Sequence, residues 1–522
     1  VDLVLHNGRV AVIDEAFTIH SAIAIDDGRV VAVGGDEIVS QYTGTEVFDL
    51  RGRLVVPGFN DTHIHLSGQP NHQLDLAGMG SVQELKEAVA AKAGEVGPGN
   101  WVTGVAWSED DFVEQRRPLR ADLDEAAPDN PVVLTRAGSH SSVANTLALE
   151  LGGIDRNTPD PTGGIIEKGP DGEPNGILRE QAMGLVRRHV PQTSPEELRE
   201  SLVERTRNLL SLGITSFILA GATPDQFEEW ETIYAEYGDE LPRATIQIRG
   251  DDLESLQSFG KKTGDGDERL RVGAVKLVVD GGYTGAAAYT LEPYVGQPGF
   301  FGQLLIPEDE LFRLLRGAHE MGWQVGIHAI GDAAIQLTVD VLDRILTELP
   351  RSDHRHYLTH FTVMPPDETL DKIVRHDILV AQQPNFVYTL EGRYVEHLDG
   401  RRLELNNAVG TLQQRGIFVA LGADVLPIDP RVGLYSAVTR KGRSGRVFGE
   451  EDRITMQEAI RGYSANGAHL TWEEDTKGTL EEGMLADLVV LGEDLLTIDP
   501  ERILEVPVDM TVVNGRIVYE RD

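Results

Sequence analysis

Cysteine is absent from the 522 residues of the chain. Disulfide bonds, zinc–thiolate centres and a cysteine nucleophile are therefore excluded, and any metal site must use nitrogen and oxygen ligands. The sequence also lacks an uninterrupted apolar run of about 18 residues, and it does not begin with a charged segment followed by an apolar one. These absences predict a protein without a membrane span or a secretory signal, and we expect a cytoplasmic location.

Basic residues are scarce as well. The chain has 85 acidic and 47 basic residues, a formal net charge of −38, and only 9 of the basic residues are lysine. Such a charge repels nucleic acid and anionic membranes, so we expect a small-molecule substrate as the partner. Many carboxylates with few lysines favour an origin in a halophile, because at molar salt the Debye length falls to about 3 Å and screens self-repulsion. A merely acidic protein is the alternative.

The two ends of the chain have the same pattern of alternating apolar and polar residues. Short alternating runs joined by turn dipeptides occupy residues 1–34 and 479–522, and "NGRV" at residue 7 is echoed by "NGRI" at residue 514. Alternation around Asn-Gly turns is typical of β-hairpins. We therefore predict one small β-sandwich domain formed by residues 1–56 plus 477–522, with residues 57–476 inserted between its halves.

The middle of the chain predicts an α/β fold, a (β/α)8 TIM barrel. Apolar runs bounded by turn residues recur between amphipathic stretches, as expected for parallel strands that are buried on both faces. Eight such runs can be found, at residues 54–59, 213–220, 244–249, 272–279, 323–329, 354–361, 377–383 and 416–424.

One connection is too long for a single helix. Residues 66–212 separate the first two runs, and we interpret them as a large insertion after barrel strand 1. Loops that follow barrel strands lie at the catalytic face, so this insertion is expected to cover the site. Its His140 and Trp107, and Tyr283 just after the fourth run, are candidate substrate contacts; core packing or plain exposure is the alternative for each.

Histidines and one carboxylate lie where barrel strands end. His63 and His65 share one side of the first strand, because side chains alternate along a strand. The same position is taken by His328 after the fifth run, His360 after the sixth and Asp424 after the eighth. Together they form a nitrogen and oxygen ligand set that suits Zn²⁺, whereas a single histidine is more often structural. His354 and His356 lie deeper in the sixth run, and we interpret His72, His189 and His376 as surface residues.

Lys276 lies within the fourth run and is expected to face the barrel interior. A buried ammonium is costly and is rarely left unpaired. One interpretation is a salt bridge to Asp280 or Asp424. The other is that the amine has reacted with carbon dioxide to give a carbamate, an anionic ligand able to bridge two metal ions.

The order of these residues resembles the amidohydrolase superfamily. More narrowly, "PGFNDTHIHL", "VKLVVDGG", "HAIGD" and "GADVLP" are similar to the amidohydrolase-3 group, which includes N-substituted formamide deformylase-like proteins. The resemblance implies that His63 and His65 bind one metal with Asp424, that carboxylated Lys276 bridges, and that His328 and His360 hold a second metal. It also suggests a homodimer. The sequence departs from the family pattern at Ala423, where serine is commoner, but Asp424 is retained.

The ligand set predicts hydrolysis by a metal-bound hydroxide, and the resemblance implies that the bond cleaved is a carbon–nitrogen bond other than a peptide bond. A bound divalent metal, one or two ions, lowers the pKa of a water ligand towards about 7, so that hydroxide attacks the substrate carbonyl. Asp424 then acts as the catalytic general base and returns the proton to the leaving nitrogen. The resemblance favours a linear or N-formyl-type amide. The alternatives are a cyclic amidase, a deaminase, or a non-catalytic regulatory or ligand-binding barrel.

Overall fold

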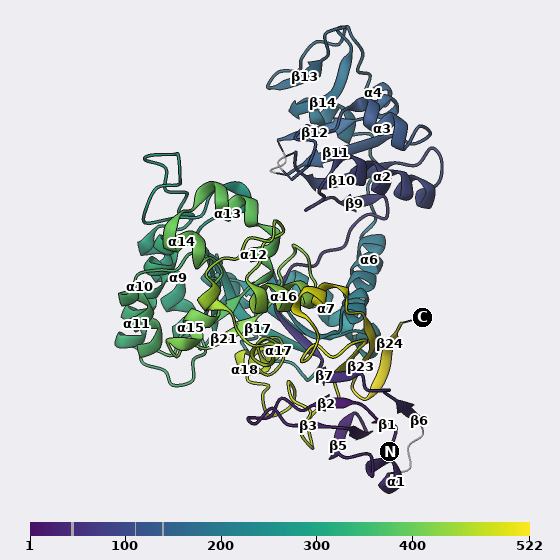
Figure 1. Cartoon of the computed structure of the whole chain (residues 1–522). Helices are drawn as coiled ribbons and strands as arrows, with labels where there is room; N and C mark the ends of the chain where they lie inside the picture. Colours follow the sequence, from purple (N-terminus) through teal and green to yellow (C-terminus); the bar gives the residue numbers. More distant parts are fainter. Residues whose placement is uncertain (43–45, 110, 138–139, 522) are drawn as a thin grey trace. The chain divides into compact units, whose positions relative to one another are not determined.

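The computed structural model describes residues 1–42, 46–109, 111–137 and 140–521. They form two compact units, one of residues Val1–Leu66 with Arg205–Asp522 and one of residues Ser67–Glu204 (Figure 1). No helix in the described residues is long and apolar enough to cross a membrane. Each unit has its own sheet structure and core.

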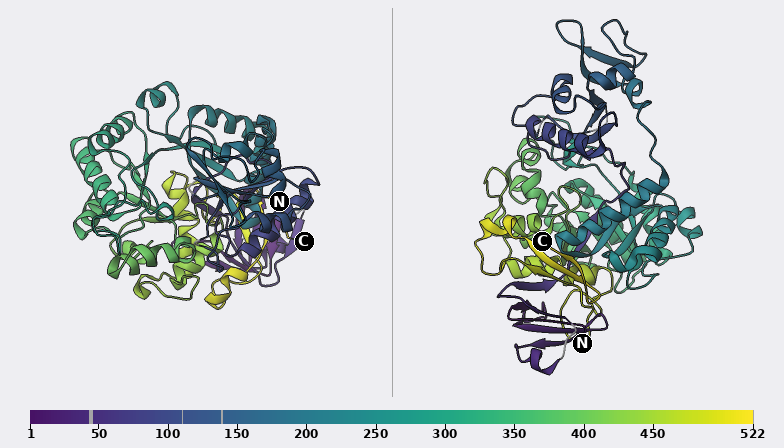
Figure 2. Two further views of the ribbon diagram at one scale, coloured as in Figure 1. Left: turned by 90° about the horizontal axis from the view of Figure 1, so that it is seen from above. Right: turned by 90° about the vertical axis from the view of Figure 1, so that its right-hand side faces the viewer.

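A parallel barrel forms the centre of the first unit, and the helices of this unit surround it (Figure 2). A bridge between Ile64 and Asp424 joins the first strand to the segment after the last one and closes the ring. The (β/α)8 prediction is therefore confirmed. In sheet order the strands are β8 (Phe59–Ile64), β15 (Ile214–Ala222), β16 (Arg243–Arg249), β17 (Leu270–Val278), β18 (Val325–Ala329), β19 (Tyr357–His360), β20 (Leu379–Gln382) and β21 (Val419–Leu421).

The outer helices are held to the barrel by apolar stripes. In α10 the buried residues Ile335, Val339, Leu342 and Leu346 recur every three or four positions, which places them on one face. The helices of this unit are α1 (Ile38–Gln41), α7 (Pro224–Tyr237), α8 (Leu253–Ser258), α9 (Glu308–Glu320), α10 (Asp332–Glu348), α11 (Asp367–Arg375), α12 (Asn385–Thr389), α13 (Glu391–His397), α14 (Gly400–Glu404), α15 (Gly410–Gln414), α16 (Pro430–Thr439), α17 (Met456–Gly462) and α18 (Ala465–Leu470).

The first predicted barrel run was wrong. Residues 54–57 form β7 (Leu54–Pro57), which belongs to the terminal β domain, and the barrel strand is β8. The two strands are separated by Gly58, where a side chain would collide with Thr215. Strand β8 has the sequence FNDTHI and is buried at every position. An apolar-run criterion misses it because its buried residues are mostly polar.

Both ends of the chain build the terminal β domain (Figure 1). Its core joins Leu3 and Ile25 from the start of the chain to Leu488 and Val512 from the end. One sheet has the order β5 (Arg29–Gly34), β4 (Ala22–Asp26), β1 (Leu3–His6), β6 (Glu46–Asp49). The other has the order β24 (Arg516–Glu520), β23 (Val508–Val513), β22 (Leu488–Leu491), β7, β2 (Arg9–Ala11), β3 (Ile19–His20).

The second unit is a separate α/β body. Its six-stranded sheet packs on α2 (Val82–Val96), α3 (Arg120–Ala126), α4 (Thr146–Leu151) and α5 (Met183–Arg187). In sheet order the strands are β13 (Gly164–Lys168), β14 (Pro174–Glu180), β12 (Ser141–Ala144), β11 (Val132–Arg136), β10 (Val102–Trp107) and β9 (Gln73–Asp75). Helix α6 (Pro195–Asn208) then leads back to the barrel.

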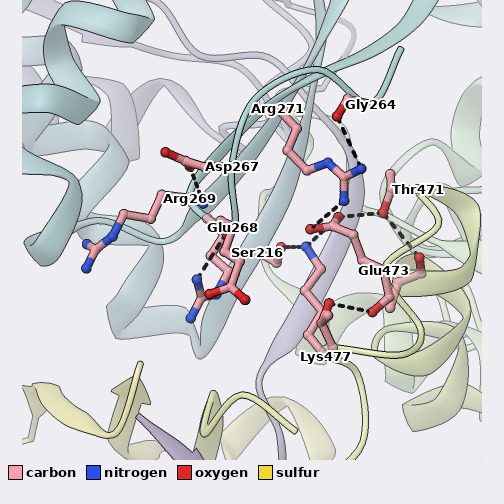
Figure 3. Close-up of polar contacts among 12 residues, drawn as sticks. Ser216, Gly264, Asp267, Glu268, Arg269, Arg271, Thr471, Glu473 and Lys477 are labelled. Atoms are coloured by element: carbon pink, nitrogen blue, oxygen red, sulfur yellow. Dashed lines mark hydrogen bonds and ion pairs between the residues drawn. The ribbon is translucent and has the colours of Figure 1, made fainter. Parts of the chain in front are cut away.

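A buried polar cluster lies where the barrel strands begin, and we call it the floor network (Figure 3). Its lysine, Lys477, lies 2.8 Å from a Glu473 oxygen and donates a 2.7 Å hydrogen bond to Ser216 Oγ. Glu473 also accepts from Thr471 Oγ1 at 2.7 Å and lies 3.5 Å from Arg271. Every charged group of this network therefore has a charged partner.

Candidate metal centre

His63 is fully buried in β8, and neither of its ring nitrogens has a hydrogen-bond partner in the described part of the chain. Its backbone is fixed, because His63 N donates to Asp61 Oδ1 at 3.1 Å. Buried polar atoms are normally hydrogen-bonded, so an orphaned imidazole indicates a missing ligand.

His360 and Asp424 complete a compact triad with His63. One ligand atom from each residue can be chosen so that all three lie within 4.8 Å of one another. Both residues have left-handed backbones, with φ of 76° at His360 and 62° at Asp424. Such conformations cost energy outside glycine and cluster at functional sites. Asp424 is held there by its own N–H, which donates to His63 O at 2.7 Å.

The other two predicted histidines border this triad. The His328 ring centroid lies 4.4 Å from that of His360, and His328 Nε2 is buried without a hydrogen-bond partner among the described residues. His65 follows β8, with its ring 5.2 Å from His63 and its Nε2 3.6 Å from Asp424 Oδ1. Its side chain is 52% exposed, so it forms the open side of the cluster.

Lys276 is only 6% exposed, and its Nζ has no hydrogen-bond partner among the residues that the structure describes. The salt bridge to Asp280 or Asp424 that the sequence suggested is not formed. Burial lowers the pKa of Lys276 to about 7, although Asp424 opposes this shift. Burial likewise raises the pKa of Asp424 to about 7, against the attraction of Lys276. Burial therefore favours the neutral form of the Lys276 amine over the ammonium.

The cluster fits a divalent metal ion. Burial, together with the charge on Lys276, lowers the pKa of His63, His328 and His360 well below its usual value, so the three imidazoles are neutral. Neutral imidazoles with free lone pairs and a nearby carboxylate form a ligand set for Zn²⁺ or a similar cation. A cation would also satisfy the orphaned nitrogens.

Sequence reasoning missed the carboxylates that position the ligands. Asp61 is fully buried, and its Oδ1 accepts both from His63 N and, at 3.0 Å, from Ala423 N. It thus connects the backbones of two ligand segments. Asp280 similarly accepts from Ile330 N, Gly331 N and Tyr289 N, and lies 3.8 Å from His328 Nε2. An aspartate inside a buried strand is the sequence signal that could have revealed Asp61.

The three predicted substrate contacts have different environments. Trp107 is fully buried in the core of the unit of residues Ser67–Glu204, and its indole N–H donates to Leu134 O at 3.1 Å. His140, in the same unit, has an 81% exposed side chain 3.1 Å from Glu180. Tyr283 is 2% exposed in an aromatic cluster of the barrel unit, and its hydroxyl has no partner in the described residues.

Comparison with known proteins gives a consistent result. The model of the amidohydrolase family matches residues 46–519. YtcJ of Bacillus subtilis (strain 168), whose name describes it as an amidohydrolase, is 31% identical over 99% of both chains. N-substituted formamide deformylase of Arthrobacter pascens is 27% identical, over 100% of this chain and 98% of that protein. An uncharacterized metal-dependent hydrolase from Pyrococcus horikoshii OT3 has a similar fold, with a TM-score of 0.70 at 24% identity over 96% and 99% of the two chains.

Proposed function

The chain belongs to the amidohydrolase family and is a metal-dependent hydrolase, and from this premise we propose that it hydrolyses a linear, N-formyl-type amide. The observation that carries the catalytic part is the group of orphaned ligand atoms at the barrel mouth, on His63, His328, His360, Lys276 and Asp424. The formyl-type substrate is supported by the full-length similarity to an N-substituted formamide deformylase.

We propose zinc as the metal, held by His63, His65, His328, His360 and Asp424. Nitrogen and oxygen ligands without thiolate suit this ion. Lys276 is proposed to carry a carbamate when the metal is bound, since carbamate formation requires a neutral amine and the pKa of Lys276 is lowered to about 7 by burial. The carbamate would replace an unpaired buried amine with an anion that the cation neutralises.

The chemistry divides between the cation and the protein. A bound metal would supply a Lewis acid for the substrate carbonyl and would lower the pKa of a water molecule, so that hydroxide could form near neutral pH. Asp424 accepts the proton of that water and gives it to the leaving nitrogen, a role that needs a pKa near the working pH. Asp61 accepts hydrogen bonds from the backbone N–H groups of His63 and Ala423 and so fixes the two segments that carry His63 and Asp424. Among the candidate substrate contacts, the buried hydroxyl of Tyr283 has no partner in the described residues, and we propose that it donates to a substrate oxygen.

The test is hydrolysis by protein reconstituted with Zn²⁺ and bicarbonate in molar KCl, because the charge of −38 favours a screened solution. We expect bound zinc by elemental analysis and release of formate from N-alkyl and N-aryl formamides. Zinc binding with turnover of cyclic amides alone would contradict the substrate assignment. Absence of bound metal under these conditions would contradict the hydrolytic site itself.

A further inference from the structure

An arginine lies beside the metal centre and has no role in the ligand set. Arg249 is the last residue of β16, and in the strand register it is paired with Lys276 of β17. Two residues earlier, Gln247 donates its side-chain amide to Tyr357 Oη at 2.7 Å, inside the barrel. Side chains two residues apart share a face of a strand, so Arg249 leaves β16 on the interior side, at the mouth.

A glycine in the neighbouring strand makes room for this side chain. A methyl group added at Gly221 of β15 would lie 3.3 Å from Lys276 Cγ and 3.8 Å from Arg249 Cγ. The side chains of Lys276 and Arg249 therefore flank the same gap. The strand end is also fixed, because Gly250 N donates to Lys276 O at 2.9 Å. Arg249 is thus held at a defined position next to a metal ligand.

The guanidinium of Arg249 is exposed and unpaired. In the described part of the chain, no carboxylate lies within ion-pair distance of it. Other surface arginines have carboxylate partners, as Arg313 does with Glu310 and Arg316 with Glu320. The charge of Arg249 acts instead on the metal centre, since it adds to the burial and to Lys276 in lowering the pKa of His65.

We propose that Arg249 binds a carboxylate on the substrate, so that the preferred substrate is an anionic amide such as an N-acylated amino acid. This inference rests on the proposed amide hydrolysis and specifies its substrate class. A guanidinium offers paired N–H donors that match the two oxygens of a carboxylate. From its place beside Lys276 it would orient the substrate while the amide carbonyl faces the metal ligands.

Acidic neighbours make a cationic substrate the competing interpretation. Arg249 borders a hollow of about 580 Å³ that is also lined by Asp225, Glu228, Asp251 and Asp252. These four carboxylates are exposed, so salt screens their repulsion, whereas a bidentate contact at the guanidinium is retained. The assay must therefore compare substrates of similar size that differ mainly in charge, in molar KCl.

Three formamides meet this requirement: N-formylglycine, its uncharged amide, and N-(2-aminoethyl)formamide, which is a cation. The parent is expected to favour the anion. Arg249→Gln is expected to lower kcat/KM for N-formylglycine by about 10- to 100-fold and to leave the uncharged amide within about threefold. Arg249→Lys should retain part of the preference. The control is Arg51→Gln, a change at an exposed arginine of the terminal β domain, which should affect none of the three.

Equal loss on all three substrates in Arg249→Gln, or a preference of the parent for the cation, would overturn the inference while leaving amide hydrolysis intact. If the parent cleaves none of them, the proposed function fails, and calorimetric binding then decides the inference. In that case N-formylglycine must still bind more tightly than its uncharged amide, and this difference must disappear in Arg249→Gln.

Discussion

Each end of the barrel buries a lysine to a similar degree, but only the lysine at the floor has polar partners among the described residues. At the floor, Lys477 is 4% exposed and is paired with Glu473 and hydrogen-bonded to Ser216 (Figure 3). At the mouth, Lys276 is 6% exposed and has no partner among the described residues. Burial without a partner is costly, so a fold retains it only where the group is used.

The histidines follow the same division. At the mouth, ring nitrogens of His63, His328 and His360 are orphaned. At the floor, His356 Nε2 lies 2.9 Å from His319 Nδ1, and His356 Nδ1 accepts from Val325 N at 3.1 Å. Residue type and burial alone do not separate the two groups. The presence or absence of a partner does, as expected if the strand C-termini serve catalysis and the opposite end serves stability.

The largest expected effect is at the mouth. Lys276→Met should lower kcat/KM on the order of 10³-fold, because the variant cannot form the carbamate ligand. The free energy of unfolding of the metal-free protein should not fall, since an apolar side chain replaces an unsatisfied amine. Urea unfolding of the metal-free parent is the reference, because bound metal would stabilise the parent selectively. A marked loss of stability in the metal-free variant would show that Lys276 is structural.

The same substitution at the floor should have the opposite result. Lys477→Met leaves Glu473 buried without its nearest cation, which should cost about 3 kcal/mol in the free energy of unfolding. Zinc content and kcat/KM at a temperature where the variant is folded should remain those of the parent. Adding Glu473→Gln should restore most of the stability, because the uncompensated charge is then removed. If the double variant is no more stable than the single one, the ion pair is not the source of the loss.

The recurrence of apolar runs in the sequence predicts the positions of the apolar barrel strands well and those of the polar strands poorly. Strands β15 to β21 each overlap a predicted run, but β8 was missed because Asn60, Asp61 and His63 are polar and buried. The six candidate ligand positions could be predicted because five of them lie at strand ends and because the order of all six resembles that of a known family. The hydrogen bonds that stabilise the mouth and the floor could not be predicted. Those between Ala423 N and Asp61 and between Lys477 and Ser216 join residues hundreds of positions apart in the sequence. The same limit applied to His356, whose partner His319 lies on another element.

The smallest expected effect is the pH dependence of the floor histidines, whose hydrogen bonds define their protonation. Because Val325 N donates to His356 Nδ1, that nitrogen carries no proton, so Nε2–H donates to His319 Nδ1 and His319 Nε2–H donates to Leu349 O at 2.9 Å. Both rings are therefore neutral, and a further proton would break one of these bonds. Consistently, burial lowers the pKa of His356 well below its usual value, with nearby His354 and Arg351 adding to the shift.

A histidine that is neutral when folded binds a proton more readily in the unfolded chain. Stability is therefore complete above the unfolded pKa of about 6.5 and is lost as the pH falls below it. When the pH falls from 7.5 to 5.5, the metal-free parent should lose unfolding free energy as the unfolded chain takes up a proton at His356. The metal-free His356→Gln variant should lose about 1.4 kcal/mol less, because this proton uptake is absent. The mouth histidines contribute equally to parent and variant, so the difference reports on His356 and its partner His319. If His356→Gln keeps the parent's pH dependence, the floor imidazole is protonated in the folded protein, and the contrast between the two ends of the barrel would then be limited to the lysines.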